Sequence, residues 1–221
     1  MSEKFVKIPA GNILLEAFYD RGRGEDAAVL HHPLPLYGGS MDNNVVLALQ
    51  KVLSGWGWST LRFNFRSVGR SGGNFNEKEG DVEDALAAAA YLRGQGHEAV
   101  HLAGYSYGAW IVLKAIQKGL DASSLVLVSP PLDFLDFKGL ELPSKPCLIT
   151  LGENDDFCSV ASLEKWLKDQ PGAANFVSRS ILPQCDHFYW GVESRLSLEV
   201  KDFLQAHFHS SASEKSREPG N

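Results

Sequence analysis

The chain has 221 residues, enough for one domain with a substantial buried core. Hydrophobic residues make up 44% and charged residues 22% of it, which excludes a disordered chain and is the usual balance of a globular protein. The formal net charge of −6 argues against nucleic acid or an anionic membrane as a partner. Three cysteines without a Cys-x-x-Cys pair, and an N-terminus without an apolar signal-peptide core, lead us to expect a reduced, cytoplasmic protein.

Strand-like and helix-like runs alternate along the chain, and this order predicts an α/β fold of three layers, a mostly parallel sheet with helices on both faces. The expected strands are Lys4–Pro9, Ile13–Tyr19, Ala27–His31, Ser59–Phe65, Ala99–Ala103, Ser124–Ser129, Pro146–Leu151 and Asn175–Leu182, the first two forming an antiparallel hairpin. The expected helices are Asp42–Leu53, Asp81–Arg93, Ser106–Gln117, Val160–Leu167 and Arg195–Ala206. We expect residues 1–208 to form a single domain and the small, polar residues 209–221 to be a disordered tail.

A nucleophile elbow is predicted around Ser106, the central residue of Gly104-Tyr105-Ser106-Tyr107-Gly108. This G-x-S-x-G pattern stands between an expected strand and an expected helix, as the motif requires. Such a turn holds the serine in a strained backbone conformation, with its hydroxyl exposed above the sheet at a helix N-terminus. The two glycines allow strand and helix to pass closely. With 21 glycines the bare pattern can arise by chance, but its context makes Ser106 the candidate nucleophile.

A serine nucleophile needs a general base, and His187 is the best candidate among the seven histidines. With an elbow of this kind the partners follow in the order Ser, then Asp or Glu, then His, which removes the four histidines that precede Ser106. His207 and His209 lie in the last helix and the polar tail, where a solvated side chain is the simpler interpretation. His187 lies in a loop between the last strand and the last helix, and position and order together favour a catalytic role.

The carboxylate that orients the histidine is expected in the turn after the strand Pro146–Leu151. This turn contains three carboxylates, Glu153, Asp155 and Asp156. Glu153 is expected in solvent, and the residues themselves leave Asp155 and Asp156 as alternatives. Asp186 is next to the histidine in sequence, but a neighbour on a loop points its side chain elsewhere, so we assign it to turn formation.

Taken together, these motifs resemble those of the α/β-hydrolase superfamily, and more narrowly those of its small, capless bacterial members, a group related to esterases and dienelactone hydrolases. The resemblance extends from about Phe5 to about Phe208. Besides the elbow it rests on residues 32–43, 62–71, 152–156 and 186–188. It implies the three-layer α/β-hydrolase fold and a Ser-His-Asp triad. The family spacing of strand, Gly-x-x and Asp selects Asp155 as the acid, with Asp156 as the alternative.

The loop of residues 32–39, which follows the third expected strand, is the candidate for one half of an oxyanion hole. Such a strand-to-helix loop supplies one backbone N–H, and the residue after the serine supplies the other. Pro33 and Pro35 have no N–H to donate, so Leu34 between them is the expected first donor and Tyr107 the second. The family more often has a histidine where Leu34 stands, so the mouth of this site is expected to be less polar.

No cap domain is expected, because residues 130–145 are too few for the helices that larger relatives insert at this point. The site should therefore be shallow and open. Aromatic side chains from its loops would form an apolar wall for an acyl group, although core packing explains many of them equally well. The expected substrate-binding residues are Tyr37, Tyr105, Phe134, Phe157 and Phe188.

The combined prediction is a serine hydrolase that cleaves carboxylic esters of short or compact acyl groups through an acyl-enzyme intermediate. Ser106 attacks, His187 transfers the proton and Asp155 orients the imidazole. A thioesterase or acyltransferase could use the same triad, and a binding protein without turnover on the same fold is a less favoured alternative. No metal-ligand spacing is present, no cofactor is expected, and the expected partner is a small-molecule ester.

Overall fold

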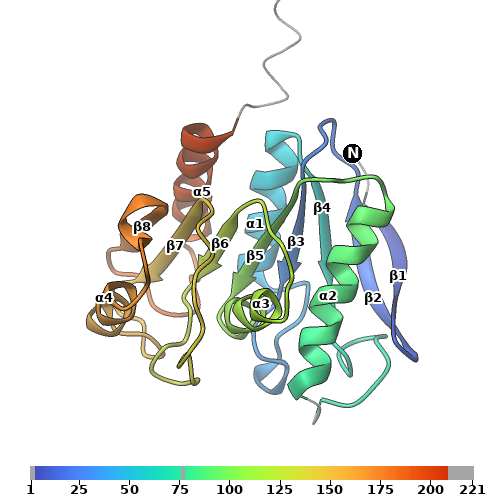
Figure 1. The fold of residues 1–221 in the computed structure, drawn as a ribbon, viewed down its shortest axis with the longest axis horizontal. Coiled ribbons are helices and arrows are strands. Elements are labelled where there is room, and N and C mark those ends of the chain that lie inside the picture. The colour runs from blue at the N-terminus through green and yellow to red at the C-terminus, as the bar shows by residue number, and fades with distance from the viewer. Residues whose placement is uncertain (1–2, 76–77, 209–221) are drawn as a thin grey trace, which may run out of the picture.

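The computed structural model describes residues 3–75 and 78–208, which contain one eight-stranded sheet between two layers of helices (Figure 1). The strands are β1 (Lys4–Ala10), β2 (Ile13–Asp20), β3 (Ala27–His31), β4 (Ser59–Phe63), β5 (Val100–Tyr105), β6 (Leu125–Val128), β7 (Cys147–Gly152) and β8 (Val177–Leu182). They lie in the order β1-β2-β4-β3-β5-β6-β7-β8. β2 pairs antiparallel with β1 and with β4, and every other neighbouring pair is parallel.

Five α-helices in the described residues cover the two faces of this sheet. They are α1 (Asn44–Trp56), α2 (Lys78–Gly94), α3 (Tyr107–Gln117), α4 (Val160–Lys168) and α5 (Glu193–His207). α2, α3 and α4 pack on one face, around a core that includes Ala88, Ile111 and Leu163; α1 and α5 pack on the other, around Leu49 and Leu196. Because both faces are covered, every residue of β3 to β7 is buried.

This architecture confirms the predicted fold class, and each expected strand and helix is present. Some boundaries differ from the prediction. The strand expected over Ser59–Phe65 ends at Phe63, because the N–H of Phe65 donates to the imidazole of His32 and not to a neighbouring strand. The connection between β6 and β7 contains turns and no helix, so no cap covers this side of the sheet. The tail expected over residues 209–221 lies outside the described residues.

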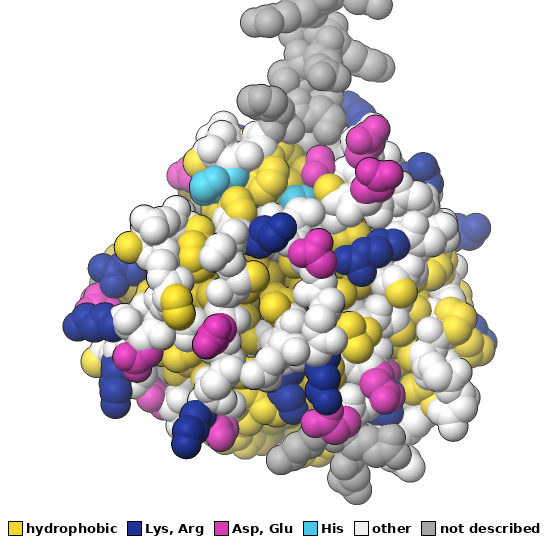
Figure 2. Space-filling view, viewed as in Figure 1, with side chains coloured by type: hydrophobic (Ala, Val, Ile, Leu, Met, Phe, Trp, Pro, Cys, Tyr) yellow, Lys and Arg dark blue, Asp and Glu magenta, His cyan; other side chains and the backbone are white. Residues whose placement is uncertain are grey.

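Figure 2 shows the face of the molecule that α2, α3 and α4 cover. Positive and negative side chains are interspersed on it, and no large patch of one sign is visible. None of the helices in the described ranges is long and apolar enough to cross a membrane.

Four loops meet at the carboxyl edge of the sheet and carry the candidate site. Residues 32–43 follow β3, Ser106 follows β5, Asp155 follows β7 and His187 follows β8. Because parallel strands all end at the same edge, side chains that are far apart in sequence come together there.

Candidate active site

Ser106 occupies a strained turn between β5 and α3. Its φ is 54° and its ψ is −117°, a conformation that residues with a Cβ rarely adopt. The backbone N–H of Ser106 donates to the carbonyl oxygen of Val128 in β6 at 2.8 Å, which ties the turn to the sheet. α3 begins at the next residue, so the positive end of its dipole lies at the serine.

Both glycines of the elbow are required by close backbone contacts. A Cβ on Gly104 would lie 2.6 Å from backbone atoms of Gly108, and a Cβ on Gly108 would lie 2.3 Å from the carbonyl oxygen of His31 in β3. Real Cβ atoms essentially never approach so closely. A larger residue at either position would therefore push α3 away from the sheet and displace the serine between them.

The imidazole of His187 lies between Ser106 and Asp155. Its Nε2 is 2.8 Å from Ser106 Oγ, and its Nδ1 is 2.9 and 2.8 Å from the two carboxylate oxygens of Asp155. Because a carboxylate can only accept, Nδ1 carries the proton, and Nε2 is left to accept the hydroxyl proton of Ser106. All three residues are at least nine-tenths buried, so these contacts are shielded from competing water.

The structure brings Asp155, and not its neighbours, to the histidine. Oδ1 of Asp155 also accepts the N–H groups of Phe157 at 2.9 Å and Cys158 at 3.1 Å, which orient the carboxylate. Asp156 is exposed. Glu153 is exposed as well, and its carboxylate accepts the N–H of Gln184 from the loop that carries His187.

Three contacts position the loop of His187. The hydroxyl of Tyr105, at the end of β5, donates to the carbonyl oxygen of His187 at 2.7 Å. The ring of Phe157 lies 4.5 Å from the imidazole, centroid to centroid. Asp186 accepts the N–H groups of Phe188 and the following residue through Oδ1, which is the turn-forming role expected for it.

The loop after β3 brings Leu34 to the pocket beside Ser106. Leu34 precedes a short 3₁₀ turn, Pro35–Tyr37, and its carbonyl oxygen accepts the N–H groups of Tyr37 and Gly39, both at 3.1 Å. Tyr107 is the first residue of α3 and has no carbonyl in the preceding turn to accept its N–H. Leu34 and Tyr107 both line the same pocket as Ser106, so the two expected donors are neighbours in space.

His32 holds this loop in place, a role that the sequence did not reveal. Its Nδ1 donates to the carbonyl oxygen of Pro33 at 2.6 Å, and its Nε2 accepts the N–H of Phe65 at 3.1 Å. A neutral imidazole satisfies both bonds, and burial lowers the pKa of His32 to about 3. The sequence feature that could have indicated this role is the position of His32, directly after a strand and directly before Pro33.

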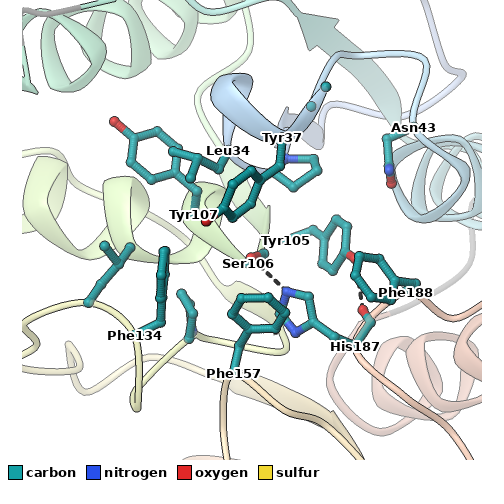
Figure 3. A pocket seen from close by; sticks show the side chains of 15 residues that line it. Leu34, Tyr37, Asn43, Tyr105, Ser106, Tyr107, Phe134, Phe157, His187 and Phe188 are labelled. Atoms are coloured by element: carbon teal, nitrogen blue, oxygen red, sulfur yellow. Dashed lines mark hydrogen bonds between the residues drawn. The ribbon is translucent and has the colours of Figure 1, made fainter.

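The pocket beside Ser106 is small and mostly apolar. Its volume is about 90 Å³. All five expected substrate-binding residues line it, and Figure 3 shows Phe134 on one side of Ser106 and Phe188 on the other. The expected wall contains Tyr37, Tyr105, Phe134, Phe157 and Phe188.

The members of this wall differ in what they can do. Tyr105 is only 2% exposed, and its hydroxyl donates to the backbone carbonyl oxygen of His187. It therefore holds the His187 loop in place as well as lining the pocket. Tyr37 and Phe134 are exposed and come from separate loops, and the centroids of their rings lie 6.2 Å apart at the pocket. Asn43 also lines the pocket but is absent from the expected set, because the sequence places this residue inside the helix expected over Asp42–Leu53; in the structure Asn43 is the N-cap of α1.

The side chains of two further histidines, His97 and His101, pack against other parts of the fold. His97 bonds to Tyr19, and His101 stacks on Trp58 with ring centroids 3.9 Å apart. His207 is exposed, and His209 lies outside the described residues. Within the described ranges, no group of His, Cys, Asp and Glu side chains is arranged to hold a metal ion.

The chain is similar in sequence and in structure to several bacterial proteins. No protein-family model matches it. It is 32% identical to the uncharacterized protein RP471 of Rickettsia prowazekii, over 95% of this chain and 92% of that one. It is similar in structure to XC6422 from Xanthomonas campestris, described as an α/β serine hydrolase without a lid, with a TM-score of 0.84 and 27% identity over 94% of this chain and 96% of that one.

A second solved structure agrees. An α/β serine hydrolase homologue from Coxiella burnetii matches with a TM-score of 0.83 and 29% identity, over 91% of this chain and 98% of that one. The fold and these similarities define the protein as an α/β hydrolase. Within that superfamily it belongs to the small members without a cap domain.

Proposed function

We propose that this protein hydrolyses carboxylic esters of short or compact acyl groups through an acyl-enzyme intermediate. The observation that carries the proposal is the hydrogen-bonded line from Ser106 through His187 to Asp155, buried at the carboxyl edge of the sheet. The serine hydrolases that share the lidless fold support the reaction class.

In the proposed reaction, Ser106 Oγ bonds to the acyl carbon while its proton passes to His187 Nε2. The carbonyl electron pair moves onto oxygen, and this oxyanion accepts hydrogen bonds from the N–H groups of Leu34 and Tyr107. Asp155 stabilises the imidazolium. As the tetrahedral intermediate collapses, the ester C–O bond breaks and the leaving alkoxide takes the proton from Nε2. Water then attacks the acyl-enzyme by the same route, and Ser106 regains its proton.

The pocket supports a compact acyl group. Because Nε2 must reach the leaving oxygen, the alcohol portion lies on the His187 side and the acyl portion on the opposite side, towards Phe134. A pocket of about 90 Å³ is smaller than the engineered cavity of roughly 150 Å³ that holds benzene. Acyl groups of two to four carbons are therefore expected to fit without moving the aromatic residues at the mouth.

The pocket also supports an uncharged acyl group. No Lys or Arg is among the residues that line it in the described structure. A carboxylate on the substrate would lose its hydration there without gaining a cationic partner, which is costly. Neutral esters are therefore the proposed substrates.

The test is kcat/KM across 4-nitrophenyl esters from acetate to dodecanoate, below and above their micellar concentrations. Each added methylene gains about 0.8 kcal/mol only while it is buried, so the rate should peak at a short chain and then fall. No jump is expected when micelles form, since the β6–β7 connection holds no lid. A maximum at long chains, or faster turnover of the matched thioesters, would contradict the proposal.

We also propose that the protein acts in the cytoplasm. Its cysteines Cys147, Cys158 and Cys185 are all free and buried, as suits a reducing compartment. Fractionation of cells followed by immunoblotting would test this.

A further inference from the structure

Asp81 is a fully buried carboxylate that the proposed reaction does not use. It lies in the first turn of α2 and is 0% exposed. Its Oδ2 accepts a hydrogen bond from the hydroxyl of Tyr107, while its Oδ1 is buried without a hydrogen-bond donor among the described residues. The second buried carboxylate of this helix, Asp84, differs: it accepts the backbone N–H of Arg66 at 2.8 Å and its guanidinium at 2.9 Å.

An arrangement of this kind is unfavourable for stability. A buried carboxylate with one neutral hydrogen-bond partner loses more hydration than it regains, and burial raises the pKa of Asp81 to about 6. Apolar residues of similar size often pack in such places at no cost in stability. Packing alone therefore does not explain why a carboxylate stands here.

The partner of Asp81 connects it to the candidate active site. Burial, and then the charge of Asp81, raise the pKa of the Tyr107 phenol, so the hydroxyl remains a donor and the carboxyl its acceptor. The ring of Tyr107 is held between Phe65 and Trp110, with centroids 6.0 and 5.7 Å away. In Figure 3 this ring extends away from Ser106, although the residue directly follows the serine in the chain.

The backbone and the side chain of Tyr107 therefore have different roles. Its backbone N–H is the proposed second oxyanion donor, and its phenol is anchored on α2. A donor stabilises an oxyanion well only if it is already aimed and does not move during the reaction. A charged acceptor forms a shorter and stronger hydrogen bond than a neutral one, and it acts one residue away from the strained backbone of Ser106.

We propose that Asp81 is a positioning residue for the oxyanion hole. By holding the phenol of Tyr107, it fixes the first turn of α3 and thereby the direction of the Tyr107 N–H. This inference rests on the proposed function, since it presupposes a reaction that passes through an oxyanion at Ser106.

The experiment compares Tyr107→Phe, Asp81→Asn and the double variant with the wild type. The matched control is Tyr19→Phe, which removes another buried phenol hydrogen bond, to His97 at 2.9 Å, beyond the opposite end of α2. Two rates are measured: labelling of Ser106 by a fluorophosphonate probe, and kcat and KM for 4-nitrophenyl acetate. Circular dichroism and thermal melting show whether each variant is folded.

In Tyr107→Phe, kcat and the labelling rate should both fall about tenfold with KM within about twofold, because the lost interaction stabilises the transition state. Asp81→Asn keeps an acceptor oxygen but loses the charge, so a smaller fall of about threefold is expected. The double variant should match Tyr107→Phe alone, because both substitutions remove the same link. Tyr19→Phe should keep wild-type rates even if its melting temperature falls.

Wild-type rates in both Tyr107→Phe and Asp81→Asn would overturn the positioning role, as would an equal loss in Tyr19→Phe. Multiplicative effects in the double variant would show that the two residues act separately. If Tyr107→Phe does not fold, Asp81→Asn decides the question, because it retains the whole of Tyr107. A wild-type protein that neither labels nor turns over esters would instead contradict the proposed function itself.

Discussion

Replacing Asp81 by Asn should change how the stability of this protein depends on pH. The pKa of Asp81 is raised from 3.8 to about 6 in the folded protein, mainly by burial. The folded state then binds this proton more tightly than the unfolded state does. Its contribution to stability is complete below pH 3.8 and is lost as the pH rises through about 6. An asparagine does not ionise, so the variant should not show this loss.

The size of the effect follows from the difference between the two pKa values. It spans about two pH units, and at about 1.36 kcal/mol per unit the wild type should lose about 3 kcal/mol relative to the variant between pH 4 and pH 7. For a domain of this size, 1 kcal/mol corresponds to roughly 2–4 °C in Tm. The difference in Tm between variant and wild type should therefore grow by about 6–12 °C over this range and then level off.

Some groups around Asp81 raise its pKa and others lower it. Asp84 on the same helix raises the pKa further, whereas the Tyr107 hydroxyl and Lys114 of α3 and Arg66 after β4 lower it. The assay is thermal unfolding of both proteins at several pH values from 4 to 8, with Asp156→Asn, at an exposed carboxylate, measured alongside as the control. A difference for Asp81→Asn that does not change with pH, or that shrinks as the pH rises, would refute the reasoning.

Three further predictions concern the candidate site. Ser106→Ala should reduce esterase activity by roughly 10³-fold or more while the melting temperature is retained, and wild-type turnover in purified variant would contradict the nucleophile assignment. Asp155→Asn should lower kcat by about 10⁴-fold, because the histidine would adopt the wrong tautomer. Asp156→Asn, at an exposed side chain, should change kcat little, and the opposite ranking would transfer the role to Asp156. Burial raises the pKa of Cys158 to about 12 and of Cys185 to about 11. Iodoacetamide at pH 8 should therefore modify neither cysteine in the folded protein, and mass spectrometry of the treated protein would show this. Rapid modification with loss of activity would point to a cysteine nucleophile.

The sequence by itself determined the fold class and the place of Ser106. Both depend on short-range patterns: buried runs the length of a strand, helical apolar stripes, and two glycines at a fixed spacing around a serine. The contacts at Gly104 and Gly108 show why so local a pattern suffices, since any side chain there would collide with backbone. Chain order likewise indicated His187, because the order of elements in a parallel sheet decides which loops reach its carboxyl edge.

Only the tertiary structure decided between adjacent residues and assigned partners to buried polar groups. Asp155 and Asp156 are neighbours in one turn, and which of them contacts His187 depends on how two loops 32 residues apart are packed together. The links from His32 to Phe65 and from Asp81 to Tyr107 join segments that no periodic pattern connects. Hydrophobic periodicity indicates which face of an element is buried. A hydrogen bond between buried side chains, however, forms or fails with a change of a few tenths of an ångström in the distance between donor and acceptor, and the packing of the whole domain sets that distance.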